Sequence, residues 1–520
     1  MESKKRKVNK ATFWPPVILT LAIILVGVLV PKKLDSAMGV ALDWVNHTFD
    51  WFYALGMTLL LVFCLWLAFS KYGKIRLGGK RAKAEMSFWK WFGVVLTSGM
   101  AVGITYWCIA EPMNYFTSPP IYAGYEGGTV EAAENTLRYV YLHWTFVPFA
   151  CFTAGAVVIA FLYWNCKKPF SISSGFYPLI GERALGKSRY WVNAICIFCL
   201  ICGLGTTLGL AVDQMAVGIQ YVTGITVSKN LMAFIVCIGF ALIGIVAAST
   251  GLHKGIAMVS NINMYLFIFL LVVAFVFGGT HVILNNTLTS IGKFFSFFVG
   301  ETFNTEPFYQ SGWVANQTIF YWGWWVAFGP MVGLFQVKLS KGRTVREYIL
   351  VNMIAPSIFL IIWMGTFGSS AMNMTLSGNN SIMDAITQWG SSVAFFAYAK
   401  NLPLAPIILV IAFITMIFSI VTQTEAEILT VADMCVATDE ELAKSDNFAP
   451  VWVKFVWGML MSFMAFVLLF SGGLQAVQNI SIIIGVLMLI VLLLTCLGGI
   501  KAFRNYKEYD KTLEKGEDYE

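Results

Sequence analysis

The sequence predicts an all-α membrane protein with twelve transmembrane helices, and three observations lead to that prediction. Of the 520 residues, 58% are hydrophobic and 12% are charged, whereas soluble domains carry about 25% charged residues. Apolar segments of about 20 residues, the length that crosses a bilayer core, recur along the whole chain. Lysine and arginine are abundant in alternate loops, as expected when successive loops lie on opposite sides of a membrane.

The twelve predicted spans follow the apolar segments along the chain. They lie at 12–31, 49–70, 88–115, 138–163, 190–222, 230–251, 256–283, 314–337, 345–371, 403–435, 450–472 and 478–500. The first segment lacks a small-residue cleavage site, so we expect a retained span and not a signal peptide. The stretch 284–313 is too mixed in polarity to span and is expected to form an amphipathic helix at the membrane interface.

Basic residues gather in the N-terminal segment 1–11, in the loops after the second, fourth and eighth spans, and in the tail 501–520. Because short basic loops remain in the cytoplasm, both termini are predicted to be cytoplasmic, which requires an even number of spans. The same loops account for the net charge of +7. We therefore expect the lipid bilayer, and no nucleic acid, as a partner.

Glycine and proline residues interrupt two spans that lie five spans apart. The third span contains Gly99 and Gly103, and the eighth contains Gly329, Pro330 and Gly333. Interrupted helices at matching positions of two halves are typical of inverted-repeat transporters, whose substrate site lies at the breaks. The alternative is that these glycines serve only close packing between helices.

Each repeat would contain five spans, an odd number, so the second repeat would have the opposite orientation in the membrane to the first. We therefore predict a five-plus-five inverted-repeat transporter fold, with one five-helix repeat at 88–283 and the other at 314–500. The segment 12–87 then supplies two extra N-terminal helices and a basic cytoplasmic loop.

The eighth span also carries the aromatic stretch YWGWWVAFGP. Trp324 and Trp325 each share a helix face with Phe328. The fourth span supplies Trp144 and Phe152, so two aromatic helices are expected to face each other. A cage of aromatic faces attracts a cation and best suits a quaternary ammonium group, which cannot donate hydrogen bonds. An interfacial aromatic belt is the alternative, but it fits tryptophans in the middle of a span poorly.

With these residues in view, the chain resembles the betaine/carnitine/choline transporter (BCCT) family over about residues 10–500. The stretches that carry the resemblance are WGWW followed by SKGRTVRE, GMAVGITYWCIAEPMNYF, HWTFVPF and GTTLGLAVDQM. The resemblance implies a twelve-helix inverted-repeat protein of the plasma membrane, usually a homotrimer. It also implies alternating-access transport of trimethylammonium compounds such as glycine betaine, carnitine or choline.

The resemblance assigns roles to residues that match the family's motifs. The residues implied in substrate binding are Trp144, Trp324, Trp325, Phe149, Phe152 and Phe328 in an aromatic box, and Gly99, Met100, Ala101 and Gly103 in an unwound stretch. Ala101 replaces a glycine of the family's pattern. The unwound stretch is implied to lie against the substrate carboxylate, where free N–H groups bind an anion. Arg343 and Arg346 match a cytoplasmic loop implied in gating.

The resemblance leaves the coupling ion open. In sodium-coupled relatives, hydroxyl groups on the fifth and tenth spans contribute to cation sites. At the corresponding positions of the fifth span this chain has Leu200 and Leu204, which carry no hydroxyl group. In the tenth span, Phe418 and Thr422 agree with the family's pattern, but Val421 replaces a residue with a hydroxyl group. Two of the implied sodium sites are therefore incomplete, which favours sodium independence.

Three mechanisms stay open at this point. The first is symport coupled to Na⁺ or H⁺, and the second is obligate antiport of the carnitine/γ-butyrobetaine type. The sodium-independent exchanger of the family has an arginine in the seventh span, where this chain has Asn263, so the antiport pattern is incomplete too. The third is a non-transporting betaine sensor, for which the short termini offer no signalling domain.

Acidic residues in the spans add further candidates. Intramembrane acids are costly and are functional hypotheses by default, so Asp213 and Glu425 are candidates for binding a coupling cation or proton. Glu427 cannot share a helix face with Glu425, and Glu111 is expected near the outer surface in a structural role. The histidines are His47, His143, His253 and His281. Because they are dispersed and form no metal pattern, we expect no enzyme, no catalytic residue and no cofactor beyond a coupling ion.

Overall fold

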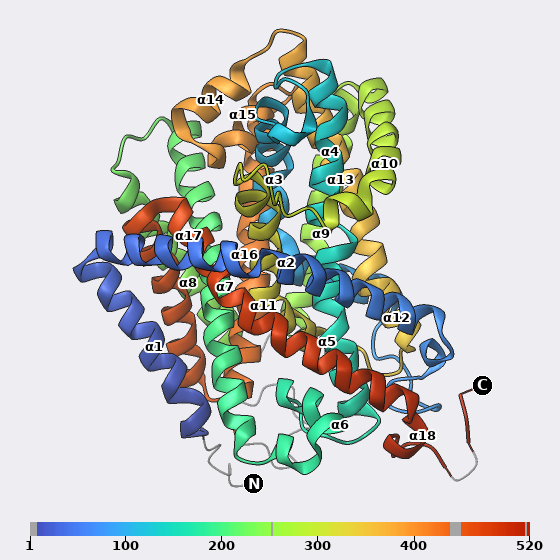
Figure 1. The fold of residues 1–520 in the computed structure, drawn as a ribbon. Helices are drawn as coiled ribbons and strands as arrows, with labels where there is room; N and C mark the ends of the chain where they lie inside the picture. The colour runs from blue at the N-terminus through green and yellow to red at the C-terminus, as the bar shows by residue number, and fades with distance from the viewer. Residues whose placement is uncertain (1–7, 251–252, 437–448, 515–516, 520) are drawn as a thin grey trace.

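The computed structural model describes residues 8–250, 253–436, 449–514 and 517–519, with the side chains of 97–102, 250 and 253–257 outside the description. Long helices packed side by side make up most of it (Figure 1). In these described ranges, extended pairing is limited to two isolated bridges, Val8 with Val436 and Arg76 with Thr344. The protein is thus all-α, as predicted.

The helices follow the predicted spans in order. Those of the first half are α1 (Lys10–Leu29), α2 (Pro31–Phe69), α3 (Phe88–Thr117), α4 (Val130–Trp144), α5 (Phe146–Trp164), α6 (Tyr177–Ile180), α7 (Ser188–Thr223), α8 (Lys229–Thr250), α9 (His253–Phe277) and α10 (Thr280–Thr302). Those of the second half are α11 (Phe320–Lys338), α12 (Val345–Ile349), α13 (Ala355–Leu376), α14 (Ser381–Trp389), α15 (Ala394–Lys400), α16 (Ala405–Met434), α17 (Val451–Arg504) and α18 (Tyr506–Tyr509). Short π-helical turns, Ala315–Ile319 and Leu350–Ile354, precede α11 and α13.

Ten helical segments among the described residues are long and apolar enough to cross a membrane. One of them, α17, covers the last two predicted spans and bends at Gly472 and Gly473, where the positive φ of 66° at Gly473 suits a residue without a Cβ. The ten include α10, which begins at Thr280 and ends at Thr302, so the predicted interfacial helix at 284–313 has the wrong bounds. Its placement at the interface stays a prediction.

The predicted helix breaks are wrong in both spans, because α3 and α11 are each continuous. The glycines of α11 instead allow α5 to approach closely. A Cβ at Gly329 would lie 2.5 Å from the Phe152 ring, and one at Gly333 would lie 2.5 Å from the Phe152 carbonyl oxygen. Small residues serve this purpose at many membrane helix contacts, and membrane helices tolerate proline, so Pro330 stays within the helix.

The fourth span is the one that breaks. Its two parts, α4 and α5, meet at Thr145, whose φ of −116° and ψ of −124° are not helical. Pro148 contributes to the break because it has no N–H group to donate to the carbonyl four residues earlier. Trp144 is therefore the last residue of α4, held at a change of direction beside α11.

The described segments near the two ends of the chain, the start of α1 and the helix α18, lie toward the lower side of Figure 1. The Asn9 N–H donates to the Cys435 carbonyl (2.8 Å), and the Lys511 N–H donates to the Asn165 carbonyl (3.0 Å). These contacts join both termini to loops that follow α16 and α5.

Candidate functional site

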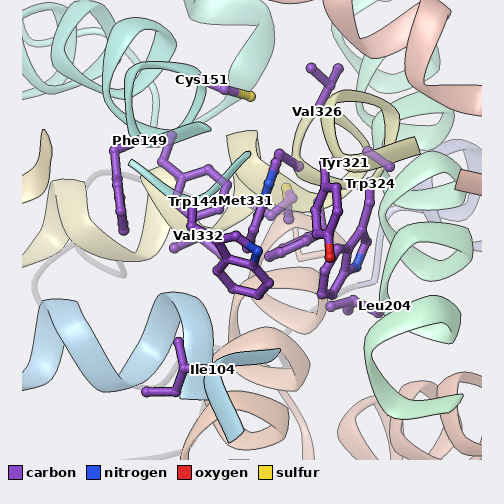
Figure 2. Close-up of a cluster of buried hydrophobic side chains, with 14 of the residues drawn as sticks. Ile104, Trp144, Phe149, Cys151, Leu204, Tyr321, Trp324, Val326, Met331 and Val332 are labelled. Carbon is purple, nitrogen blue, oxygen red and sulfur yellow. The ribbon is translucent and has the colours of Figure 1, made fainter. Parts of the chain in front are cut away.

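Ring contacts bring the six predicted aromatic residues together between α4, α5 and α11. Figure 2 labels three of them, Trp144, Phe149 and Trp324. All six side chains are buried. The Trp144 ring centroid lies 5.0 Å from that of Trp325 and 6.2 Å from that of Trp324, and the rings of Trp324 and Trp325 are 4.8 Å apart. Phe152 contacts both Trp325 (5.6 Å) and Phe328 (5.5 Å). We call Trp144, Trp324, Trp325, Phe149, Phe152 and Phe328 the aromatic cluster.

The three indoles form a corner. Trp324 and Trp325 are nearly parallel, at 21°, while Trp144 stands almost perpendicular to both, at 82° and 84°. These separations are those of aromatic rings in direct contact. A trimethylammonium group can therefore enter only if at least one of the rings moves, so the cluster is in a closed arrangement.

Each indole N–H group of the corner already has a protein acceptor. The hydrogen bonds run from Trp144 to Glu111 Oε2 (2.5 Å), from Trp325 to the His143 carbonyl (2.9 Å) and from Trp324 to Thr207 Oγ1 (3.0 Å). The His143 carbonyl is turned toward Trp325 because the chain leaves the helix two residues later, at Thr145. With their N–H groups occupied, the indoles offer a ligand their π faces and C–H edges.

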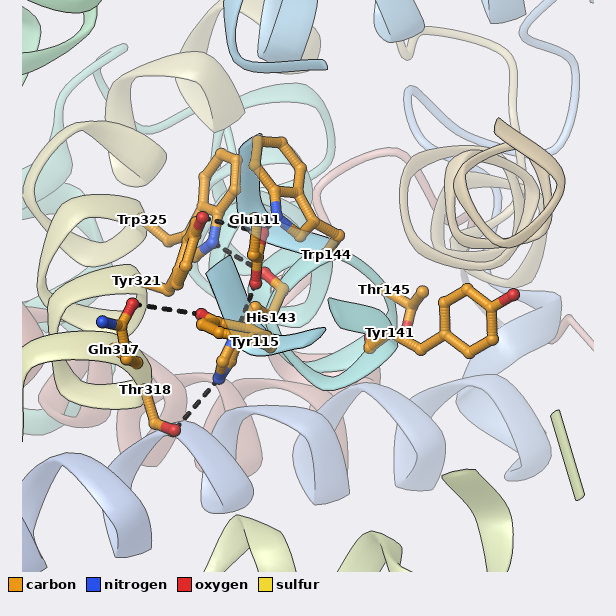
Figure 3. A network of polar contacts seen from close by, with 10 residues as sticks. All are labelled: Glu111, Tyr115, Tyr141, His143, Trp144, Thr145, Gln317, Thr318, Tyr321 and Trp325. Carbon is orange, nitrogen blue, oxygen red and sulfur yellow. Dashed lines mark hydrogen bonds and ion pairs between the residues drawn. The ribbon is translucent and has the colours of Figure 1, made fainter. Parts of the chain in front are cut away.

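Glu111 of α3 holds this arrangement together (Figure 3). Its Oε2 accepts from Trp144 and from the Tyr321 hydroxyl (2.7 Å), and its Oε1 lies 2.8 Å from His143 Nδ1. His143 Nε2 is in turn 3.0 Å from Thr318 Oγ1. The carboxylate thereby links α3, α4 and α11.

Glu111 is buried, with only 1% of it exposed, and its expected position near the outer side of the membrane stays a prediction. Sequence reasoning missed Glu111, His143, Tyr321 and Thr207 as residues that position the indoles. One signal was available for Glu111, because it follows an apolar run and an acid within a span is a functional hypothesis by default.

The glycine stretch of α3 reaches the aromatic cluster at Gly103. A Cβ there would lie 2.8 Å from Trp144 Cη2 and 3.2 Å from Trp324 Cη2. The predicted contacts of Met100 and Ala101, together with any contact at Gly99, fall outside the described side chains. Gly103 therefore belongs to the site because its missing side chain leaves room for two indoles, and not because α3 unwinds there.

Gly103→Ala is expected to displace both indoles and to weaken ligand binding at least tenfold, since overpacking a tight contact costs about 1–3 kcal/mol. Gly93→Ala on the same helix is the matched control, because a Cβ there meets its nearest atoms, on Asn261 and Met264, at 3.4 and 3.5 Å. Titration of tryptophan fluorescence with choline measures both variants. Equal affinities would contradict the role of Gly103.

Three of the four predicted coupling residues, Asp213, Phe418 and Thr422, are already engaged in contacts within the protein. Asp213 forms an ion pair with Lys229 (3.0 Å) and accepts from the Ser392 hydroxyl. The Thr422 hydroxyl donates to the Phe418 carbonyl of its own helix (2.8 Å). The roles of Asp213, Phe418 and Thr422 in ion binding stay predictions.

Glu425, the fourth coupling candidate, is buried and lies where Lys454 of α17 acts on it electrostatically. Lys454 Nζ also donates to the Ala248 carbonyl (3.0 Å). A buried ammonium group stabilises a nearby buried carboxylate, so the position of Glu425 has a structural explanation. Its role as a coupling site stays a prediction.

The predicted gating loop contacts the end of α2 and the start of α3. Arg343 donates to the Met86 carbonyl (2.5 Å), and its guanidinium lies 4.7 Å from the Trp91 ring centroid. Arg346 donates to the Ala68 carbonyl (2.7 Å), where a cation is favourable because helix C-termini carry unpaired carbonyls. The loop after α11 is thus joined to segments of the first half.

Comparisons with known proteins cover almost the whole chain. The model of the "BCCT, betaine/carnitine/choline family transporter" family matches residues 11–508. A probable glycine betaine transporter of Desulfitobacterium hafniense is 32% identical over 94% of this chain and 96% of its own. A glycine betaine transporter of Bacillus subtilis is 31% identical, covering 93% and 92%. The high-affinity choline transport protein of Escherichia coli is 28% identical, covering 93% and 70%.

Among solved structures, the substrate-bound outward-open state of a Na⁺-coupled sialic acid symporter aligns with 81% of both chains, at 14% identity and a TM-score of 0.41.

Proposed function

Because the chain belongs to the betaine/carnitine/choline transporter family, we propose that it is a secondary transporter of quaternary ammonium compounds, which bind between Trp144, Trp324 and Trp325. One observation supports this site above all. The three indole N–H groups are bonded to the protein itself, so once the rings separate they offer a ligand their π faces and not a hydrogen-bond donor. A π face attracts a cation, and a quaternary ammonium cation has no N–H group that would need an acceptor.

The proposed cycle is alternating access. The closed cluster opens toward one side of the membrane, admits the cation, closes around it and then opens toward the other side. We place the protein in the plasma membrane with both termini in the cytoplasm, which the alternation of basic loops supports. We propose a homotrimer, as the family resemblance implies.

One observation favours a second candidate substrate, choline, over zwitterionic betaines. A continuous α3 keeps the N–H groups of 99–103 within its own helix, so they are not free to bind a carboxylate in this state. Choline carries the trimethylammonium group without a carboxylate. Competition between choline and glycine betaine for one binding site distinguishes these candidates, with choline expected to bind more tightly.

The test is uptake of labelled choline and glycine betaine into proteoliposomes that are either empty or preloaded with the same compound. Uptake in either condition, saturable and absent from protein-free vesicles, is the expected result. Uptake confined to preloaded vesicles identifies the antiport alternative, whereas accumulation in empty vesicles identifies symport. Saturable binding without any movement of substrate would overturn transport in favour of a sensor.

A further inference from the structure

Glu427 of α16 is a buried acid with only half of its carboxyl group satisfied. The residue is 4% exposed. Its Oε1 accepts from Gln423 Nε2 (3.0 Å), whereas its Oε2 has no hydrogen-bond partner among the residues that the structure describes. A buried carboxyl oxygen left unpaired is costly, so the free oxygen needs an explanation.

The space beside Glu427 is a small cavity of about 10 Å³ between α11 and α16. It is lined by Met331, Val332, Phe335, Ala426, Glu427 and Thr430. Met331 and Val332 lie three and four residues after Phe328, so the cavity is one helical turn from the aromatic cluster. Glu427 is the one ionisable residue among these six, and a volume of this size holds about one water molecule.

The charged groups around α16 act elsewhere. Lys454 of α17 acts on Glu425, on another face of α16. Lys338 of α11 pairs with Asp433 (2.7 Å), near the end of α16. Among the described residues, the side chain that interacts with Glu427 is the neutral Gln423, and no charged side chain from the helices packed against α16, which are α3, α7, α8, α9, α11, α15 and α17, pairs with it.

An unbalanced carboxylate in an apolar interior takes up a proton in preference to remaining charged. Sodium does not suit the cavity, because a metal cation needs several oxygen ligands. Besides Glu427, the walls offer one side-chain oxygen, on Thr430, whose hydroxyl donates to the Ala426 carbonyl (2.7 Å). A proton needs only the one free oxygen.

We propose that Glu427 is a proton-binding site of the transport cycle. It is neutral while α11 and α16 are in contact, and it releases its proton to water when these helices separate on the side of the termini. The inference rests on the proposed transport function and adds to it the identity of the coupling ion. The Lys338–Asp433 ion pair joins the same two helices at that side, so its opening accompanies access to Glu427.

Proteoliposomes that enclose a pH-sensitive dye test this proposal. With the wild-type protein, choline uptake is expected to carry protons inward and to increase at least fivefold under an inwardly directed proton gradient. Glu427→Gln is expected to retain exchange of labelled for unlabelled choline but to lose the response to the gradient. Glu126→Gln, which makes the same change at an exposed glutamate, is the matched control and is expected to respond as the wild type does.

Each result decides between the claims. Choline uptake by the wild type that neither moves protons nor responds to the gradient would overturn proton coupling and leave transport standing. A full gradient response in Glu427→Gln would overturn the assignment to this residue. If no substrate moves at all, the transport function fails, and infrared spectroscopy still tests the carboxyl group. The band of a protonated carboxylic acid at neutral pH is expected to weaken in Glu427→Gln, and an unchanged band would contradict a neutral Glu427.

Discussion

Glu111→Leu is expected to destabilise the folded protein by about 3–5 kcal/mol, the cost of removing one partner from a buried polar network, and to abolish choline binding. The carboxylate accepts from Trp144 and Tyr321 and faces His143. Leucine leaves these three buried polar groups without that partner, and each unsatisfied group costs about 1–3 kcal/mol. Denaturant unfolding in detergent, followed by tryptophan fluorescence, measures the loss of stability.

Two variants serve as controls for Glu111. Glu111→Gln keeps one acceptor oxygen, so it is expected to lose less stability and to retain weakened binding. Glu126→Leu replaces an exposed glutamate and is expected to change stability by no more than about 0.5 kcal/mol. Wild-type stability and affinity in Glu111→Leu would contradict the role of the carboxylate in holding the indoles.

Trp324→Leu is expected to weaken choline binding about 30-fold. A desolvated cation–π contact is worth about 2 kcal/mol, and every 1.4 kcal/mol changes a dissociation constant about tenfold. Leucine preserves apolar volume but has no π face, whereas Trp324→Phe keeps a smaller ring and is expected to lose less. Equilibrium binding of labelled choline to the purified protein measures the three affinities.

The control for Trp324 is Trp191→Leu, which removes a tryptophan that is 59% exposed on α7 and is expected to bind choline as the wild type does. Thr207→Val tests a separate part of the account. It removes the acceptor of the Trp324 N–H but leaves the ring, so its effect is expected to be smaller than that of Trp324→Leu. If Trp324→Leu bound choline normally, the aromatic cluster would not be the binding site.

The helices could be predicted from the sequence because membrane spans are read from local composition. The spacing of Trp324, Trp325 and Phe328 likewise placed them on one helix, and the structure brings Trp144 against them. Short spacings along a helix are fixed by its geometry, so this part of the site required no knowledge of distant contacts.

The parts that sequence reasoning missed depend on contacts between distant residues. The partners of Glu111 lie 33 and 210 positions away, at Trp144 and Tyr321. Gly329 and Gly333 resemble helix breakers in sequence, but their role is set by Phe152 of another helix. The break at Thr145 was not predicted, because the apolar segment 138–163 continues through Pro148 without a change in composition.

The central claim is that the aromatic cluster binds a cation through π faces. It is tested most directly by competition between labelled choline and its neutral carbon isostere, in which a tert-butyl group replaces the trimethylammonium group. The two compounds have nearly the same shape but differ in charge. The account predicts that the isostere binds at least about 30-fold more weakly, the loss of one cation–π contact of about 2 kcal/mol. Equal displacement of labelled choline by the isostere would contradict it, because the site would then recognise shape and apolar surface alone.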